Sequence, residues 1–445
     1  MTSFRAAPLC ILLAVLTTAA APAQPQRPWR GIAVDVARRF VAPARLRRLV
    51  DLAAHLRFNV VHLHLTDNEA WRLPSRAFPL LVSRTHYTET DLRALARYAQ
   101  RRGVMLVPEI DMPAHNTAAI RAYSQLACGS ADDTLCPRTA SQFAARVVAE
   151  VARIFPAAYV HAGGDEVDGW SAQDRRTFEQ RLNAYCRRIG KTMVVWDDES
   201  DAAPSSAVVE VWHLGDVARQ AMRRGHRVIV ASDGPFYFDA AQGDAAQEPP
   251  GTRYMSTLEE VYANGVPRAA FGVEAVLWSE HLRSDDDLWY MLLPRAIAAS
   301  AVANGPPTAP WPVFRDRILP REFAWLLRHG YTFRVSNTLM SVLDGSARYA
   351  SVQGNQNAAA AFVSRRRVQI ALRSLVPNSE IFYRSGTQTQ WKRYGRPFCI
   401  DAADGVRVDA RTRAPNGRTG AITTLFVRRA FKPRGSAHFD DVVSP

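Results

Sequence analysis

The chain has 445 residues, of which 47% are hydrophobic and 22% charged, and its net charge is +14. This composition excludes a disordered chain and leaves enough apolar residues for one large domain and one small one. The last 85 residues hold sixteen Lys and Arg against six Asp and Glu, a net charge of +10. A basic C-terminal segment predicts attraction to an anionic envelope or polymer surface, with an ordinary solvated charged face as the alternative.

Residues 1–23 have the layout of a secretory signal peptide. One Arg precedes an apolar run from Leu9 to Leu16, and small residues follow as far as Ala23. The run is too short to span a membrane, so we expect an exported protein, secreted or periplasmic. Export permits disulfides, and Cys128 and Cys136 flank a loop that a bridge could close, although proximity along the chain does not by itself give the required geometry.

Short apolar or β-branched runs alternate with longer amphipathic segments between residues 28 and 335. The predicted strands are 31–36, 59–64, 104–108, 159–162, 192–196, 208–212, 227–231 and 270–278. Helical spacing of apolar residues marks segments between them, such as 44–57 and 89–103. Eight strands alternating with helices favour an α/β fold of the closed (β/α)8 TIM barrel type over an open sheet.

Residues 340–445 predict a small, basic β-rich module appended to the barrel. The runs EIFYRSG and GVRVDARTR alternate in the manner of strands, and an Asn416-Gly417 turn precedes AITTLFV.

Polar and aromatic side chains gather where the eight predicted strands end. In a parallel barrel these ends share one face, which carries the active site. A single such residue could be a helix cap, but a set on all eight strands predicts a carbohydrate-sized pocket lined by acids and indoles. The set is Asp35, His62, His64, Asp67, Glu109, Asp111, His115, Asp165, Glu166, Trp196, Asp197, Asp198, Trp212, Ser232, Asp233, Tyr237, Asp239, Trp278 and Glu280.

These motifs resemble those of the family 20 glycoside hydrolases, the β-N-acetylhexosaminidases. The similarity runs from Arg30 to about Phe333 and includes RGIAVDVARRF, NVVHLHLTDNEAWRL, VPEIDMPAH, HAGGDEV and LWSE. The resemblance is to a short form of the family, in which we expect no counterpart of the α/β domain that precedes the barrel in many members. It implies exo-acting removal of terminal N-acetylhexosamine with retention, through an oxazolinium ion formed by the substrate's own acetamido group.

The resemblance also implies a role for each catalytic residue. Glu166 would be the general acid and then the general base, while Asp165 would orient the acetamido nitrogen and Tyr237 would donate to the acetamido oxygen. His115 and Asp67 would form a relay to Glu166. A mechanism of this kind implies no metal and no cofactor.

The substrate-binding residues follow from the same resemblance. A box around the acetamido methyl and the sugar face would consist of Trp196, Trp212 and Trp278. Arg30 would bind the ring hydroxyls O3 and O4, and Asp239 and Glu280 would hold O4 and O6.

Two alternatives remain open at this stage. A metal-dependent hydrolase barrel would use His62 and His64, since two histidines at a strand end can be metal ligands, although both can equally be core residues. A sugar-binding barrel that has lost catalysis is the second alternative. The sequence indicates no nucleic-acid ligand, does not indicate an oligomeric state, and does not separate N-acetylglucosamine from N-acetylgalactosamine.

Overall fold

The structure is a computed structural model that describes residues 26–129, 133–249, 254–343, 347–352 and 355–430. The predicted signal peptide lies outside these residues. Within the described part of the chain, no helix is both long and apolar enough to cross a membrane.

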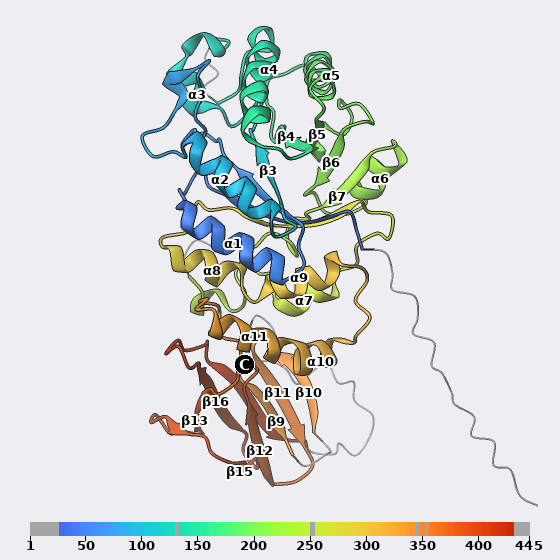
Figure 1. Ribbon diagram of the computed structural model, residues 1–445. Coiled ribbons are helices and arrows are strands. Elements are labelled where there is room, and N and C mark those ends of the chain that lie inside the picture. Colours follow the sequence, from blue (N-terminus) through green and yellow to red (C-terminus); the bar gives the residue numbers. More distant parts are fainter. Residues whose placement is uncertain (1–25, 130–132, 250–253, 344–346, 353–354, 431–445) are drawn as a thin grey trace, which may run out of the picture.

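Eight parallel strands form a closed barrel, which confirms the predicted fold class (Figure 1). Strand β1 pairs with β2 on one side and with β8 on the other, so the sheet has no free edge. The barrel strands are β1 (Trp29–Asp35), β2 (Val60–His64), β3 (Met105–Glu109), β4 (Tyr159–His161), β5 (Thr192–Trp196), β6 (Val208–Val211), β7 (Arg227–Val230) and β8 (Gly272–Leu277).

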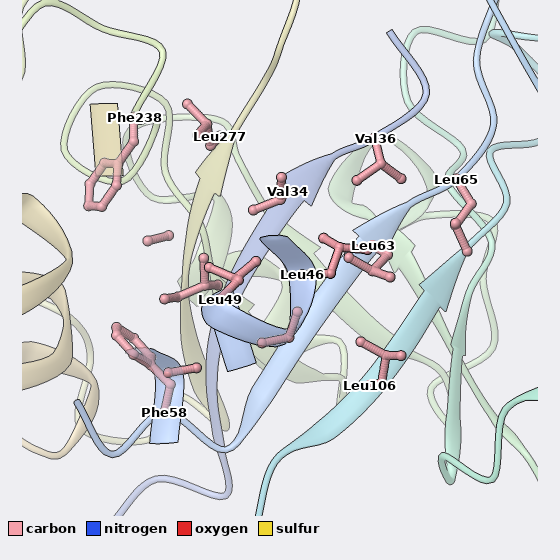
Figure 2. Packing of buried hydrophobic residues seen from close by; sticks show 14 of the residues in the cluster. Val34, Val36, Leu46, Leu49, Phe58, Leu63, Leu65, Leu106, Phe238 and Leu277 are labelled. Carbon is pink, nitrogen blue, oxygen red and sulfur yellow. The ribbon is translucent and has the colours of Figure 1, made fainter. Parts of the chain in front are cut away.

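Helices surround the barrel and bury their apolar faces on it. Leu46 and Leu49 of α1 lie in one buried cluster with Leu63 of β2 and Leu106 of β3 (Figure 2). The helices are α1 (Pro43–His55), α2 (Glu89–Gln100), α3 (Thr117–Ala122), α4 (Pro137–Ile154), α5 (Ala172–Arg188), α6 (Val217–Arg223), α7 (Leu258–Ala263), α8 (Asp285–Leu292), α9 (Arg295–Ala303), α10 (Trp311–Val313) and α11 (Leu319–Arg328). Single turns are η1 (Pro79–Leu81), η2 (Ser124–Leu126), η3 (Asp197–Glu199), η4 (Ala245–Gln247) and η5 (Phe314–Ile318).

Cap residues set several helix starts. The Thr88 side chain accepts from the Asp91 amide at the start of α2, and the Asp91 side chain accepts from the Thr88 amide, which satisfies donors that a helix start leaves unpaired. Cys128 and Cys136 form a disulfide just before α4, with Cα atoms 4.8 Å apart. The pairing that the sequence left open is therefore present.

The C-terminal β module lies beside α10 and α11 and contains two sheets (Figure 1). Residues of both sheets, among them Ile370 and Val408, share one buried core. A six-stranded sheet has the order β10-β11-β17-β16-β13-β14 and a three-stranded sheet the order β15-β12-β9. The strands are β9 (Leu339–Val342), β10 (Arg348–Val352), β11 (Asn355–Val363), β12 (Arg367–Arg373), β13 (Glu380–Ser385), β14 (Lys392–Arg393), β15 (Phe398–Asp401), β16 (Val406–Arg413) and β17 (Thr423–Arg429).

Candidate active site

A pocket opens at the C-terminal ends of the barrel strands. The predicted site residues line it, with the exceptions of Arg30 and Trp196. Its full lining is Arg38, His64, Asp67, Asp111, His115, Asp165, Glu166, Trp212, Asp233, Tyr237, Asp239, Tyr254, Trp278 and Glu280. Residues from distant parts of the chain thus meet on the face that the barrel topology predicts.

The turn after β4 presents Asp165 and Glu166 to the pocket. Gly163 and Gly164 have φ angles of 72° and 95°, which glycine adopts without steric cost. A Cβ atom on Gly163 would overlap the Asp111 carboxyl group, and the Gly164 amide donates to Asp111 Oδ1 at 3.1 Å. Glu166 itself has a φ of 52°, so the two glycines and the acid pair form one tight turn.

His115 connects the acids of the pocket. Its Nε2 atom lies 3.6 Å from Asp165 Oδ2 and 3.5 Å from Glu166 Oε2, and its Nδ1 atom lies 3.5 Å from Asp67 Oδ1. Burial alone would lower the pKa of His115, but its contacts with Asp67 and Glu166 and the other nearby carboxylates raise it to about 12. A positively charged imidazolium therefore lies between the acids. The Glu166 side chain is 65% exposed and open to a substrate.

Asp111, which is buried, and Asp165, whose side chain is 15% exposed, form an acid pair in the pocket. Burial and the charge of Asp165 raise the pKa of Asp111 well above its ordinary value. Burial also raises the pKa of Asp165, although the His115 charge opposes this. Two carboxyl groups in such a position favour holding one proton between them.

Arg38 occupies the place in the pocket that the sequence interpretation gave to Arg30. Its Nη2 atom lies 2.8 Å from Asp67 Oδ2 and its Nε atom 3.4 Å from Glu280 Oε1. The assignment of Arg30 was wrong: its guanidinium donates to the carbonyl groups of Arg27 at 2.6 Å and Arg57 at 3.0 Å, at the N-terminal end of β1. Strand direction could have identified the correct arginine. Active-site residues of such barrels lie at the C-terminal strand ends, and Arg38 follows β1 whereas Arg30 lies near its start.

An aromatic wall bounds the pocket on the side of β6 to β8. The Tyr237 ring lies 6.5 Å from that of Trp212 and 6.1 Å from that of Trp278, between ring centroids. Burial and the Asp165 charge raise the pKa of Tyr237 well above its ordinary value, so its hydroxyl keeps the proton that it can donate.

Trp196 lies beneath this wall and does not line the pocket. The side chain is 1% exposed, and its indole nitrogen donates to Glu109 Oε1 at 2.9 Å. The sequence placed Trp196 correctly at a strand end but could not give its depth. Tyr254, which lines the pocket and hydrogen-bonds to Asp233, was missed because it comes from a long loop with no motif.

The histidines of β2 point into the barrel interior. His64 contacts Glu109 Oε2 and Asp67 Oδ2, both at 2.7 Å. His62 contacts Glu274 Oε1 at 2.7 Å and Glu109 Oε2 at 3.2 Å. Each imidazole nitrogen of the pair therefore faces a carboxylate, so both histidines take part in a buried charge network.

The molecule is a closed (β/α)8 barrel whose strand ends carry paired acids, an aromatic wall and charged hydrogen-bonding groups. This combination is typical of enzymes that cleave carbohydrates. The sequence matches the family model described as glycosyl hydrolase family 20, catalytic domain, over residues 28–176 and 169–303. The chain belongs to this family and is a glycoside hydrolase.

Curated relatives agree with the family match. The β-hexosaminidase of Porphyromonas gingivalis is 32% identical over 340 residues, which are 64% of this chain and 44% of that protein. The β-hexosaminidase of Akkermansia muciniphila is 30% identical over 69% of this chain and 75% of its own length. The chain thus spans less than half of the first relative and three quarters of the second.

Solved structures show the same fold. The β-N-acetylhexosaminidase of Streptomyces coelicolor has a TM-score of 0.65 at 28% identity, covering 70% of this chain and 71% of that one. The exo-β-N-acetylglucosaminidase of Vibrio harveyi, in complex with N-acetylglucosamine, has a TM-score of 0.65 at 25% identity, covering 70% of this chain and 59% of that one.

Proposed function

We propose that the protein removes terminal non-reducing N-acetylhexosamine from glycans by retaining, substrate-assisted hydrolysis. One observation carries the mechanism: Asp165 and Glu166 both contact the same nitrogen of His115, at 3.6 Å and 3.5 Å. The two acids consequently lie on one side of the pocket.

An acid pair in this position does not suit the usual retaining mechanism. There, two carboxyl groups about 5–5.5 Å apart flank the scissile bond, one as acid and one as nucleophile. Adjacent residues that share one imidazole cannot lie on opposite faces of a sugar ring. The nucleophile is then best supplied by the substrate, through the oxygen of its 2-acetamido group.

Residues that line the pocket can carry every step of this reaction. Glu166 donates its proton to the glycosidic oxygen as the bond from that oxygen to C1 breaks, and the acetamido oxygen bonds to C1 to give an oxazolinium ion. Asp165 stabilises the positive charge on the acetamido nitrogen, and Tyr237 donates to the acetamido oxygen. Water then attacks C1 and gives a proton to Glu166, while the bond between C1 and the acetamido oxygen breaks. This restores the acid and the acetamido group, and the two inversions at C1 together retain its configuration.

The remaining pocket residues fit a terminal sugar. Trp212 and Trp278 supply apolar faces beside Tyr237, and Arg38, Asp239 and Glu280 supply charged groups for ring hydroxyls. Burial raises the pKa of Asp239 to about 6, and the Glu280 charge adds to this effect. The signal-like residues 1–23 support an exported location, secreted or periplasmic, as part of the same proposal.

The test is hydrolysis of p-nitrophenyl N-acetyl-β-glucosaminide, the matching galactosaminide and the plain β-glucoside, with and without EDTA. We expect turnover of acetamido substrates only, no effect of EDTA, and a loss of kcat of about 10²–10⁴-fold in Glu166→Gln. A thiazoline analogue of the oxazolinium ion should inhibit competitively. Cleavage of the plain glucoside would exclude substrate assistance, loss of activity with EDTA would support the metal-dependent alternative, and sugar binding without turnover would support the non-catalytic alternative.

A further inference from the structure

A second hollow lies on the C-terminal β module, away from the barrel pocket. It has a volume of about 490 Å³ and is lined by Phe382, Trp391, Arg411, Arg413, Gly417 and Thr419. The strands that form it, β13 and β16, belong to the part of the molecule opposite α4 and α5 (Figure 1). We call it the arginine groove.

Strand alternation places the groove residues on the outer face of the six-stranded sheet. Val408 and Ala410 of β16 belong to the core of the module, so the residues that alternate with them, including Arg411 and Arg413, face the other way. In the pairing of β13 with β16, Phe382 lies opposite Arg411 and Glu380 lies opposite Arg413. An aromatic ring and two guanidinium groups therefore meet on one face.

The positive charge of this face exceeds its negative charge. Asp409 pairs with Arg384 at 2.9 Å and with Arg407 at 2.8 Å. Glu380 pairs with Arg393 at 3.0 Å and, more loosely, with Arg413 at 4.0 Å. Two carboxylates are thus divided among four arginines, before Arg411 is counted.

Arg411 makes no ion pair with any residue that the structure describes. Its guanidinium carbon lies 4.4 Å from the centre of the Trp391 ring, and the guanidinium carbon of Arg384 lies 4.9 Å from the same centre. A guanidinium held against an indole ring loses little further freedom when it binds an anion. The groove therefore presents an oriented cation whose counter-charge is absent from this part of the protein.

We propose that the arginine groove binds the carboxylate groups of an acidic polysaccharide. The planar guanidinium matches a carboxylate through two parallel hydrogen bonds, and the neighbouring arginines already use carboxylates as partners. Phe382 adds an apolar surface on which a sugar ring can pack. The basic C-terminal segment predicts attraction to an anionic surface, and this proposal names a specific ligand for it. The proposal does not depend on the reaction in the barrel pocket.

The experiment measures binding of the full chain to alginate oligosaccharides, which carry carboxylates, at low and moderate salt. The test variants are Arg411→Ala and Trp391→Ala. Arg367→Ala is the matched control, because it removes the same charge from an exposed position on the three-stranded sheet. Neutral dextran, dextran sulfate and single-stranded DNA serve as comparison ligands, and hydrolysis of the small chromogenic substrate is measured in parallel.

We expect alginate binding that weakens about tenfold in Arg411→Ala and Trp391→Ala, changes less than about twofold in Arg367→Ala, and leaves hydrolysis unchanged. Absence of alginate binding, or equal losses in all three variants, would overturn the proposal. Binding of dextran sulfate or DNA as strong as that of alginate would show general polyanion attraction and would overturn the carboxylate assignment. Because hydrolysis is a separate readout, failure here is distinguishable from failure of the proposed activity.

Discussion

Arg38 lines the pocket and compensates the charge of its acids, and the proposed function also makes it a sugar-binding residue. It contacts Asp67 and Glu280, and its guanidinium carbon lies 5.3 Å from the centre of the Trp278 ring. Asp67 is 2% exposed and also contacts His64 and His115. Burial would raise the pKa of Asp67, but these positive neighbours hold it well below its ordinary value. Removing Arg38 would therefore weaken both the sugar site and the relay to Glu166.

Arg30, near the start of β1, and Arg38, just after its end, provide a direct test at the residue scale. Arg38→Ala should lower kcat/KM by about 100-fold or more, because a buried charged contact costs about 2–5 kcal/mol when truncated. Arg30→Ala removes the same charge and should change kcat/KM by no more than about twofold. Steady-state kinetics on the acetamido substrate measure both. A larger loss in Arg30→Ala than in Arg38→Ala would restore the assignment made from sequence.

At the scale of elements, the turn after β4 and the loop after β7 hold the catalytic groups by different means. The turn depends on Gly163 and Gly164, which follow a strand of three residues. The loop depends on Arg295, which is fully buried and donates to the carbonyl groups of Phe238, Ala240, Ser256 and Met291. Tyr237 and Asp239 flank Phe238, so these hydrogen bonds fix two pocket residues.

Gly163→Ala should lose both stability and activity. Its φ of 72° is strained for alanine, by about 1–2 kcal/mol, and its Cβ would displace the Asp111 carboxyl group. Gly169→Ala is the matched control, because its φ is 74° and an added Cβ meets nothing within 4 Å. Thermal unfolding should show a modest loss in Gly169→Ala and a larger one in Gly163→Ala, and kcat should fall in Gly163→Ala alone. Equal effects in the two variants would mean that the overlap has no consequence.

The order of strands and helices along the chain could be predicted from the sequence better than the burial of single side chains or the pairing of strands in the C-terminal sheet. The eight barrel strands follow from local pattern, since each is a short, mostly buried run and most of them alternate with helices. The predicted strand 270–278, for example, contains the observed β8. Trp196 could not be assigned a depth, because neighbouring strands decide which indole reaches the pocket. The parallel pairing of β11 with β17 could not be predicted either, because partners such as Ala360 and Phe426 lie 66 positions apart in the sequence.

At the scale of the whole molecule, the barrel interior contains a buried charge network. His161 contacts Glu109 at 3.2 Å and Glu210 at 3.6 Å, and His62 joins Glu109 to Glu274. Burial opposes the charging of His62, but Glu274 and Glu109 raise its pKa from 6.5 to about 10. Burial and the Glu274 charge raise the pKa of Glu210 from 4.5 to about 7, despite the nearby His161.

These shifts predict how the stability of the protein depends on pH. A group whose pKa is raised on folding binds its proton more tightly in the folded state, so its stabilisation is complete below the unfolded pKa and is lost as the pH rises through the folded pKa. Glu210 therefore loses its contribution between pH 4.5 and about 7. His62 loses its contribution between pH 6.5 and about 10. Asp67 has a lowered pKa and loses its contribution only as the pH falls below about 4. Stability should consequently be greatest on the acidic side of neutrality.

The unfolding temperature should be highest near pH 4.5 and fall steadily toward pH 10. Glu210→Gln imitates the protonated side chain at every pH, so it should flatten the fall between pH 4.5 and 7 while leaving the fall at higher pH. Glu89→Gln is the matched control: hydrogen bonds to Arg153 and Arg93 lower the pKa of Glu89 to about 2, so this variant should keep the slope above pH 4.5. Calorimetry of the three proteins across the range measures these slopes. An unfolding temperature that rises from pH 5 to 8, or a Glu210→Gln variant with the slope of the wild type, would show that the interior network does not set the pH dependence.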